Sequence, residues 1–199
     1  MSGPNSDAAV CALVLAAGKS SRFGASKLVQ PFRGKPLLQH ALLAARAACR
    51  GSVYLTVGHD RRAVTAAAAG LYDRLVVNSD YSDGMGTSIA AAIRSCPEQT
   101  DAVIVTLADQ PLVTADHLLN LRHAWSGDAN EIVATAFDET HGPPILFGQQ
   151  AFAVLSELSA DQGPRFLLTD PDFVVRTVEF APAGFDIDRP SDLCRLDQG

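Results

Sequence analysis

Short apolar runs alternate with longer helical patterns along most of this chain, and this order restricts the fold more than any other feature. Runs of strand character lie at 10–16, 53–57, 74–77, 102–107, 131–137 and 173–180, with a short additional candidate at 145–147. Apolar residues recur at helical spacing in 37–49, 60–69, 86–95, 115–125, 149–157 and 190–196. This alternation is typical of βαβ units, so we predict an α/β fold with a largely parallel sheet.

The chain is expected to fold as one unit. Its 199 residues are 47% hydrophobic, which is enough for a sizeable core, and no repeat, low-complexity tract or long linker divides it. We expect a mobile segment at 1–8 and a single domain at 9–199. The four cysteines are far apart, which favours a reduced, cytoplasmic setting. No apolar stretch approaches the roughly 20 residues of a membrane span, so no membrane insertion is expected.

Charge is distributed unevenly along the chain. The net charge of −6 argues against nonspecific nucleic-acid binding. However, no acidic residue lies between Asp7 and Asp60, a stretch that contains seven lysines and arginines. This block is either a solvated basic face or a local site for an anion.

The segment LAAGKSSRFGASK, residues 15–27, follows the first predicted strand. Its Gly18-Lys19-Ser20 tripeptide looks like the end of a P-loop, but Leu13 stands where the first P-loop glycine belongs, so that interpretation fails. Glycines, exposed backbone N–H groups and the cations Arg22 and Lys27 still suit a polyphosphate. The alternative is an ordinary glycine turn with surface cations.

Two further loops carry acidic residues where open α/β sheets bind ligands, at the carboxyl ends of strands. Asp109 follows the strand at 102–107 and can hold Mg²⁺, since Thr114 is better placed to cap the next helix. Asp186 and Asp188 alternate about Ile187 and would point the same way if the segment is extended, so one of them could complete a metal site. A turn or a helix start is the structural alternative for each loop.

The histidines give no comparable signal. His40, His59 and His141 show no metal-ligand spacing with the others, and we expect His117 and His123 on a helix surface.

Taken in order, these stretches resemble one family, the molybdenum cofactor nucleotidyltransferases or MobA-like NTP transferases, and within it the cytidylyltransferase branch. The signature L-A-A-G-x-S-x-R-x-G-x-x-K is matched by Leu15, Ala16, Ala17, Gly18, Ser20, Arg22, Gly24 and Lys27. The resemblance continues through GKPLLQHAL (34–42), NSDYSDGMGTSIAAAI (78–93), LADQP (107–111), DQGPRFLL (161–168) and DIDRPSDL (186–193). It therefore covers nearly the whole chain.

The resemblance implies a three-layer α/β/α, Rossmann-like nucleotidyltransferase domain with a mixed, mostly parallel sheet. It also implies a Mg²⁺-dependent transfer of CMP from CTP to molybdenum-bound molybdopterin, with release of pyrophosphate. The product, a molybdopterin cytosine dinucleotide, would serve a client hydroxylase of the xanthine dehydrogenase type. The acceptor phosphate is already anionic at neutral pH, so this reaction needs no general base.

The same resemblance assigns roles to individual residues. Catalysis would depend on Arg22, Lys27 and Asp109, and Mg²⁺ would bind Asp109 with Asp186 or Asp188. The nucleotide would contact Leu15, Ala16, Ala17, Gly18 and Lys27, with the segment from Gly84 to Ser88 beside the nucleoside. CTP is expected over GTP, because relatives that use GTP tend to have glycine at the position of Ala17.

Two departures from the family pattern bear on the acceptor. The chain reads His141-Gly142-Pro143-Pro144 where Gly-His-Pro is usual, and it has Pro164 where alanine is more usual. Alternatives of the same fold are a GTP-using guanylyltransferase and a sugar-phosphate nucleotidyltransferase. A non-catalytic molybdenum cofactor carrier is an alternative of another class. A redox enzyme with a dinucleotide is disfavoured because the G-x-G-x-x-G fingerprint is missing.

Overall fold

The computed structural model describes residues 8–18, 23, 26–49, 52–160 and 162–197, and a seven-stranded sheet forms its centre. The strands lie across the sheet in the order β5 (Arg74–Val77), β4 (Val53–Val57), β1 (Val10–Ala16), β6 (Ala102–Leu107), β8 (Thr140–Gly148), β7 (Glu131–Phe137) and β9 (Val174–Glu179). Neighbouring strands of this described sheet are parallel except where β8 pairs with β6 and β7. The predicted mixed, mostly parallel sheet is confirmed.

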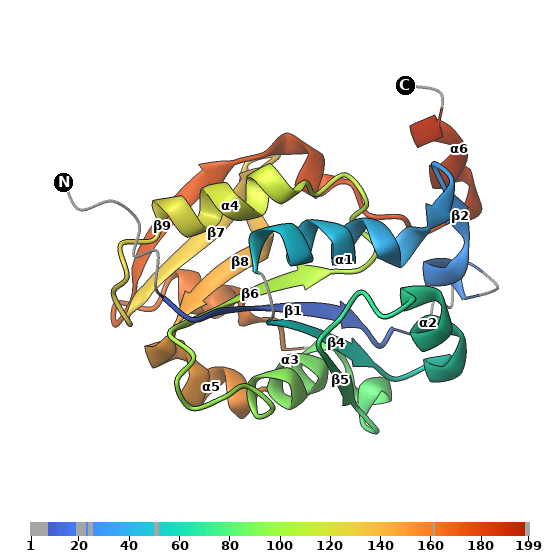
Figure 1. Cartoon of the computed structure of the whole chain (residues 1–199). Helices are drawn as coiled ribbons and strands as arrows, with labels where there is room; N and C mark the ends of the chain where they lie inside the picture. Colours follow the sequence, from blue (N-terminus) through green and yellow to red (C-terminus); the bar gives the residue numbers. More distant parts are fainter. Residues whose placement is uncertain (1–7, 19–22, 24–25, 50–51, 161, 198–199) are drawn as a thin grey trace.

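Helices cover both faces of the sheet, which gives the expected three layers (Figure 1). One face packs against α1 (Leu37–Ala48), α2 (Arg61–Ala68) and α4 (Ala115–Ala124), and the other against α3 (Met85–Ile93) and α5 (Phe152–Ser156). All seven residues of β1 are buried, and consecutive residues such as Leu13 and Val14 belong to opposite core layers. Burial on both faces explains why the strand reads as a continuous apolar run.

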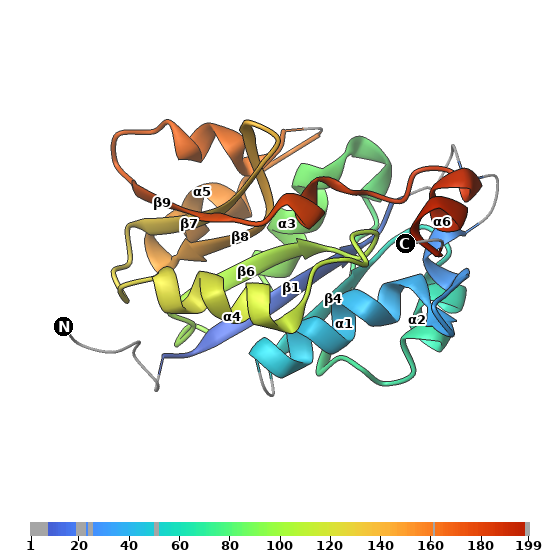
Figure 2. The same ribbon diagram turned by 90° about the horizontal axis from the view of Figure 1, so that it is seen from above.

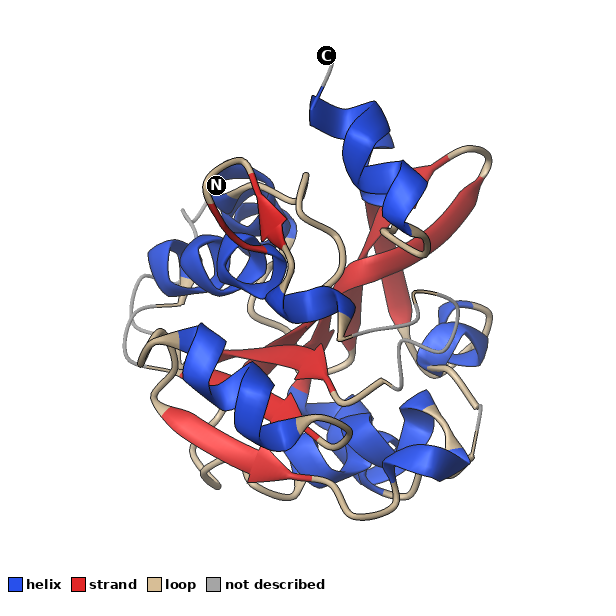
Figure 3. Ribbon diagram, turned by 90° about the vertical axis from the view of Figure 1, so that its right-hand side faces the viewer, coloured by secondary structure: helices blue, strands red, loops and turns tan. Residues whose placement is uncertain are grey.

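The last helix, α6 (Pro190–Asp197), lies at the end of the molecule to which β1 points, as Figures 1 and 2 both show. Figure 3 views the molecule from this end, with helices on either side of the strands. The predicted cap of α4 is also confirmed: the Oγ1 of Thr114 accepts a hydrogen bond of 3.2 Å from the backbone N–H of His117.

Two local predictions were wrong in extent, and one short hairpin was not predicted. The candidate strand at 145–147 is part of β8, which spans nine residues because Gly142, Pro143 and Pro144 are extended rather than turned. The predicted helix at 149–157 is a 3-10 turn at Gln149–Ala151 followed by the short α5. A hairpin of β2 (Pro31–Phe32) and β3 (Lys35–Pro36) is too short to show a sequence period.

Two further expectations concern the segment at 1–8 and membrane insertion. The segment expected to be mobile lies outside the described residues except for Ala8. Within the described part of the chain, every helix is too short or too polar to span a bilayer.

Candidate functional site

The candidate site lies where the strand order reverses. β1 is flanked by β4 on one side and β6 on the other, so the loops after β1 and β6 leave the sheet side by side. Two backbone hydrogen bonds fix this edge: Ala108 N donates to Leu15 O at 3.1 Å, and His59 N donates to Ala17 O at 3.2 Å. Open α/β sheets bind their ligands at such a point.

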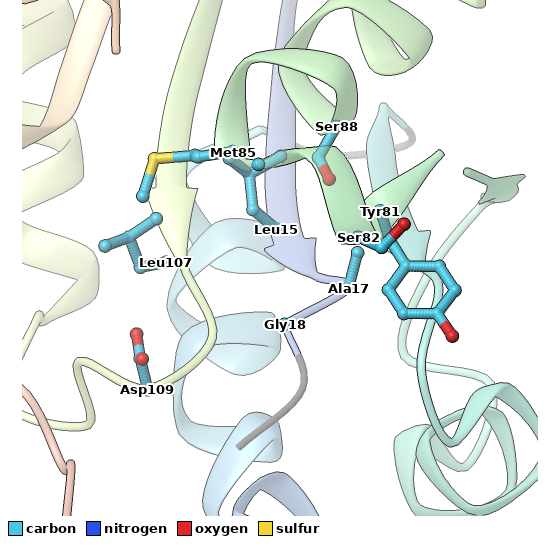
Figure 4. Close-up of a pocket in the computed structure, with 10 residues that line it drawn as sticks. Leu15, Ala17, Gly18, Tyr81, Ser82, Met85, Ser88, Leu107 and Asp109 are labelled. Atoms are coloured by element: carbon cyan, nitrogen blue, oxygen red, sulfur yellow. The ribbon is translucent and has the colours of Figure 1, made fainter. Parts of the chain in front are cut away.

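A cavity of about 310 Å³ opens at this edge (Figure 4). Six of the predicted residues line it, namely Leu15, Ala17, Gly18, Gly84, Ser88 and Asp109. Ala16 does not line it, because successive side chains of a strand point to opposite faces of the sheet. The Ala16 side chain packs into the core layer beside α1. Figure 4 shows Gly18 and Asp109 on the lower side of the cavity and Met85 and Ser88 above them.

Lys27 joins two of the predicted acidic groups beside this cavity. Its Nζ lies 2.6 Å from Asp109 Oδ2, 3.4 Å from Asp188 Oδ1 and 2.7 Å from the carbonyl oxygen of Ile187. The Lys27 side chain is only 13% exposed, whereas those of Asp109 and Asp188 are 23% and 51% exposed. The backbone N–H of Ile187 also donates to Asp109 O at 3.1 Å. The segment before α6 is therefore held against the end of β6.

Asp186 belongs to the same group of carboxylates. Partial burial and the neighbouring carboxylates of Asp109 and Asp188 raise the pKa of Asp186 to about 6, although Lys27 and Gln110 oppose the shift. The buried Ile187 separates Asp186 from Asp188. Crowded carboxylates of this kind are stabilised by a cation.

The donor set fits a divalent cation that is shared with phosphate. Asp109 and Asp188 already contact one cationic group, and burial, together with the neighbouring carboxylates, raises the pKa of Asp186. In the described residues, no three acidic, histidine or cysteine side chains converge tightly enough to hold an ion by themselves. Mg²⁺ commonly binds through one or two carboxylates plus substrate phosphates, which matches this arrangement.

A second cavity of about 260 Å³ adjoins the first and shares Met85 and Leu107 with it. Its other lining residues are largely apolar or small, with Gln110, Arg165 and Asp186 as the polar exceptions. Both departures from the family pattern lie here, since Pro143 and Pro164 line the cavity. An ideal Cβ at Gly142 would lie 3.0 Å from the Phe137 ring and 3.1 Å from the Arg165 guanidinium, so a side chain there would crowd both groups.

The site predictions are incomplete at several residues, and one histidine was placed wrongly. Arg22 lies outside the described residues, so its role stays a prediction. Tyr81, Ser82 and Leu107 line the first cavity without having been singled out. His117 was expected on a helix surface and is 2% exposed, because α4 turns it against Thr135 and Phe180.

Known proteins resemble the chain over most of its length. The MobA-like NTP transferase domain matches residues 12–175. The bifunctional protein GlmU of Desulfitobacterium hafniense (strain DSM 10664 / DCB-2) is 32% identical over 163 residues, which cover 78% of this chain and only 35% of GlmU. The chain thus spans about a third of that relative. Nicotine blue oxidoreductase of Paenarthrobacter nicotinovorans is 28% identical over 201 residues, 94% of this chain and 96% of that protein.

Solved structures agree with the sequence relatives. The crystal structure of Rv0371c from Mycobacterium tuberculosis H37Rv has a TM-score of 0.82 and 29% identity, covering 96% of this chain and 99% of that one. A complex of Rv0371c with manganese has a TM-score of 0.79 and 28% identity, with 96% and 98% covered. The domain match spans far more than half of the sequence. The chain therefore belongs to the MobA-like NTP transferase family.

Proposed function

We propose that this protein transfers CMP from CTP to molybdenum-bound molybdopterin and releases pyrophosphate, as a single-domain cytoplasmic enzyme. The observation that carries the proposal is the contact of Lys27 Nζ with Asp109 Oδ2 at 2.6 Å, beside a cavity lined by the glycine loop and the start of α3. A cation and a carboxylate so placed can hold a triphosphate and a divalent ion together.

The nucleotide would lie in the first cavity. Ala17 and Gly18 line one side of it, Gly84 and Ser88 line another, and Lys27 would face the phosphates. Arg22 would add a second cation from the same loop. Two cations at this edge would stabilise the negative charge that grows on the departing pyrophosphate.

Asp109 would hold Mg²⁺ together with Asp186 or Asp188. When bound, the ion supplies positive charge to the phosphates and helps to align them. A relative of known structure has been solved with manganese, which supports a divalent cation in this family.

The acceptor would occupy the second cavity. That cavity meets the first at Met85 and Leu107 and contains Asp186, so a phosphate at the junction would lie near the proposed metal ligands. An apolar slot with a few polar groups suits a ring system such as a pterin, and a client molybdenum hydroxylase would receive the product.

The assay is pyrophosphate release with Mg²⁺, molybdenum-loaded molybdopterin, and CTP, GTP, ATP or UTP offered separately. Release with CTP alone is expected. Release with GTP would make the protein a guanylyltransferase. Release with a sugar 1-phosphate as acceptor would instead favour a sugar-phosphate nucleotidyltransferase. Nucleotide-independent binding of the finished cofactor would favour a carrier, and substrate oxidation without pyrophosphate release would favour an oxidoreductase.

A further inference from the structure

We propose that Asn78 determines which pyrimidine the first cavity accepts, by fixing the direction of the hydrogen bond that Ser88 offers to the base. This inference rests on the proposed function, in that a nucleotide base must enter this cavity. Asn78 directly follows β5, at the same edge of the sheet as the glycine loop, and is 4% exposed.

All hydrogen-bonding groups of the Asn78 amide have partners. Its Oδ1 accepts from the backbone N–H of Asp80 at 3.0 Å, and because that group can only donate, the oxygen and nitrogen of the amide are unambiguous. Its Nδ2 donates to Thr87 Oγ1 at 2.9 Å and to Ser88 Oγ at 3.0 Å. The Thr87 hydroxyl in turn donates to the carbonyl oxygens of Gly84 and Asp80, at 2.9 and 3.0 Å.

This network leaves the hydrogen of Ser88 for a ligand. Ser88 is 5% exposed and lines the cavity, where Figure 4 shows its oxygen at the end of a side chain that projects from α3. Its oxygen accepts from Asn78, and no acceptor for its hydrogen is found among the described residues. A hydroxyl has one hydrogen to give, so Ser88 faces the cavity as a donor.

A fixed donor favours cytosine over uracil where it meets ring position 3. Cytosine has an unprotonated N3, which accepts a hydrogen bond, whereas uracil carries a hydrogen there. Within the proposed function, we assign the Ser88 hydroxyl to this N3. Against uracil two donors would meet in a buried place, and an unsatisfied buried donor costs about 1–3 kcal/mol. CTP would then be preferred to UTP by about tenfold or more.

The decisive variant is Asn78→Asp, which is nearly isosteric and reverses the hydrogen bonds. The new carboxylate keeps the contact with the N–H of Asp80 but can only accept, so the hydroxyls of Thr87 and Ser88 turn toward it. Ser88 then presents a lone pair to the base, which suits uracil. We expect the ratio of CTP to UTP affinity, measured by calorimetry with Mg²⁺, to fall at least about tenfold or to invert.

Two further variants separate this role from a structural one. Ser88→Ala removes the donor and should bring the two affinities close together without favouring UTP. Ser82→Ala, in a serine that also lines the cavity, should leave the ratio unchanged. Thermal unfolding of each variant shows whether it is folded.

Several outcomes would overturn the inference. They are an equal loss of CTP and UTP affinity in the folded Asn78→Asp protein, a Ser88→Ala protein that keeps the wild-type ratio, and a wild type that binds UTP or GTP as well as CTP. If Asn78→Asp does not fold, Ser88→Ala alone decides. A wild type that binds no nucleotide overturns the proposed function itself, which is a different result.

Discussion

The Nζ of Lys27 lies 2.6 Å from Asp109 Oδ2 and links the end of β6 to the segment before α6, because the same ammonium reaches Asp188 Oδ1 at 3.4 Å. Residues far apart in sequence are thereby held around one cation. In the proposed reaction, an incoming triphosphate would offer this ammonium a second set of anionic partners, and the carboxylates would then be available to a divalent ion.

The first prediction concerns this pair. Lys27→Ala and Asp109→Ala should each lower turnover by at least about a hundredfold, the scale of losing one preorganised electrostatic contact. Steady-state pyrophosphate release measures the effect. Lys35→Ala, in the β2–β3 hairpin, is the control and should stay near the wild-type rate. Near-normal turnover in either site variant would remove that residue from the proposed machinery.

A second prediction follows from the raised pKa of Asp186, about 6. In the unfolded chain this carboxyl ionises near pH 3.8, so above pH 6 folding carries the cost of keeping it charged where it is partly buried and close to Asp109. Asp186→Asn should therefore raise the melting temperature of the ligand-free protein at pH 8. The difference should shrink as the pH falls through 6, because Asp186 then binds a proton and loses the penalty.

The same variant should bind Mn²⁺ more weakly in the presence of CTP, which electron paramagnetic resonance can measure. If Asp186→Asn both stabilises the ligand-free protein and weakens metal binding, the carboxylate serves metal binding at the expense of stability. A variant that is no more stable at pH 8 than the wild type would contradict a cost of keeping Asp186 charged in the folded protein.

The sequence alone predicts most of the architecture. The strands at 10–16 and 102–107 pack against helices on both faces of the sheet, so each appears in the sequence as a continuous apolar run. Both strands have the predicted limits. The length of β8 was underestimated because its two prolines and a glycine are residues typical of turns. Proline tolerates an extended backbone when the partner strand does not need its N–H, and the register shift between Ala134 and Thr135 accommodates the pair.

The site could be predicted only where a motif marks it. Asp109 and the glycine loop stand at strand ends, so their position in the sequence already indicates the binding edge. The partnership of Asn78 with Ser88 depends on how α3 turns back over the end of β5, which no local pattern records. His117 was misplaced for a similar reason, because Thr135 and Phe180 come from other strands and loops.

The third prediction addresses base size. Ala17 is 4% exposed and lines the first cavity, so its methyl group narrows the space for a base. Ala17→Gly should admit GTP and raise the ratio of GTP to CTP turnover, which parallel pyrophosphate assays measure. If the variant gains no GTP use while its CTP rate is preserved, the methyl group is not what excludes the purine.

The last prediction concerns stability in acid. Burial lowers the pKa of His117 from 6.5 to about 4, because its ring stacks on Phe180 with centroids 4.1 Å apart and its Nε2 lies 2.8 Å from Thr135 Oγ1. In the unfolded chain the His117 imidazole binds a proton near pH 6.5, whereas in the folded protein it binds one only near pH 4. The contribution of neutral His117 is therefore complete above pH 6.5 and is lost as the pH falls toward 4.

Over this window the wild type should lose about 3 kcal/mol of unfolding free energy through this group. His117→Gln keeps a polar group near Thr135 but cannot titrate in this range, so its stability should change less between pH 7 and pH 4.5. Urea unfolding at several pH values measures the difference. His123→Gln, on the exposed side of the same helix, is the matched control and should follow the wild type. Parallel pH profiles for His117→Gln and the wild type would mean that the buried imidazole accepts its proton as readily as an exposed one.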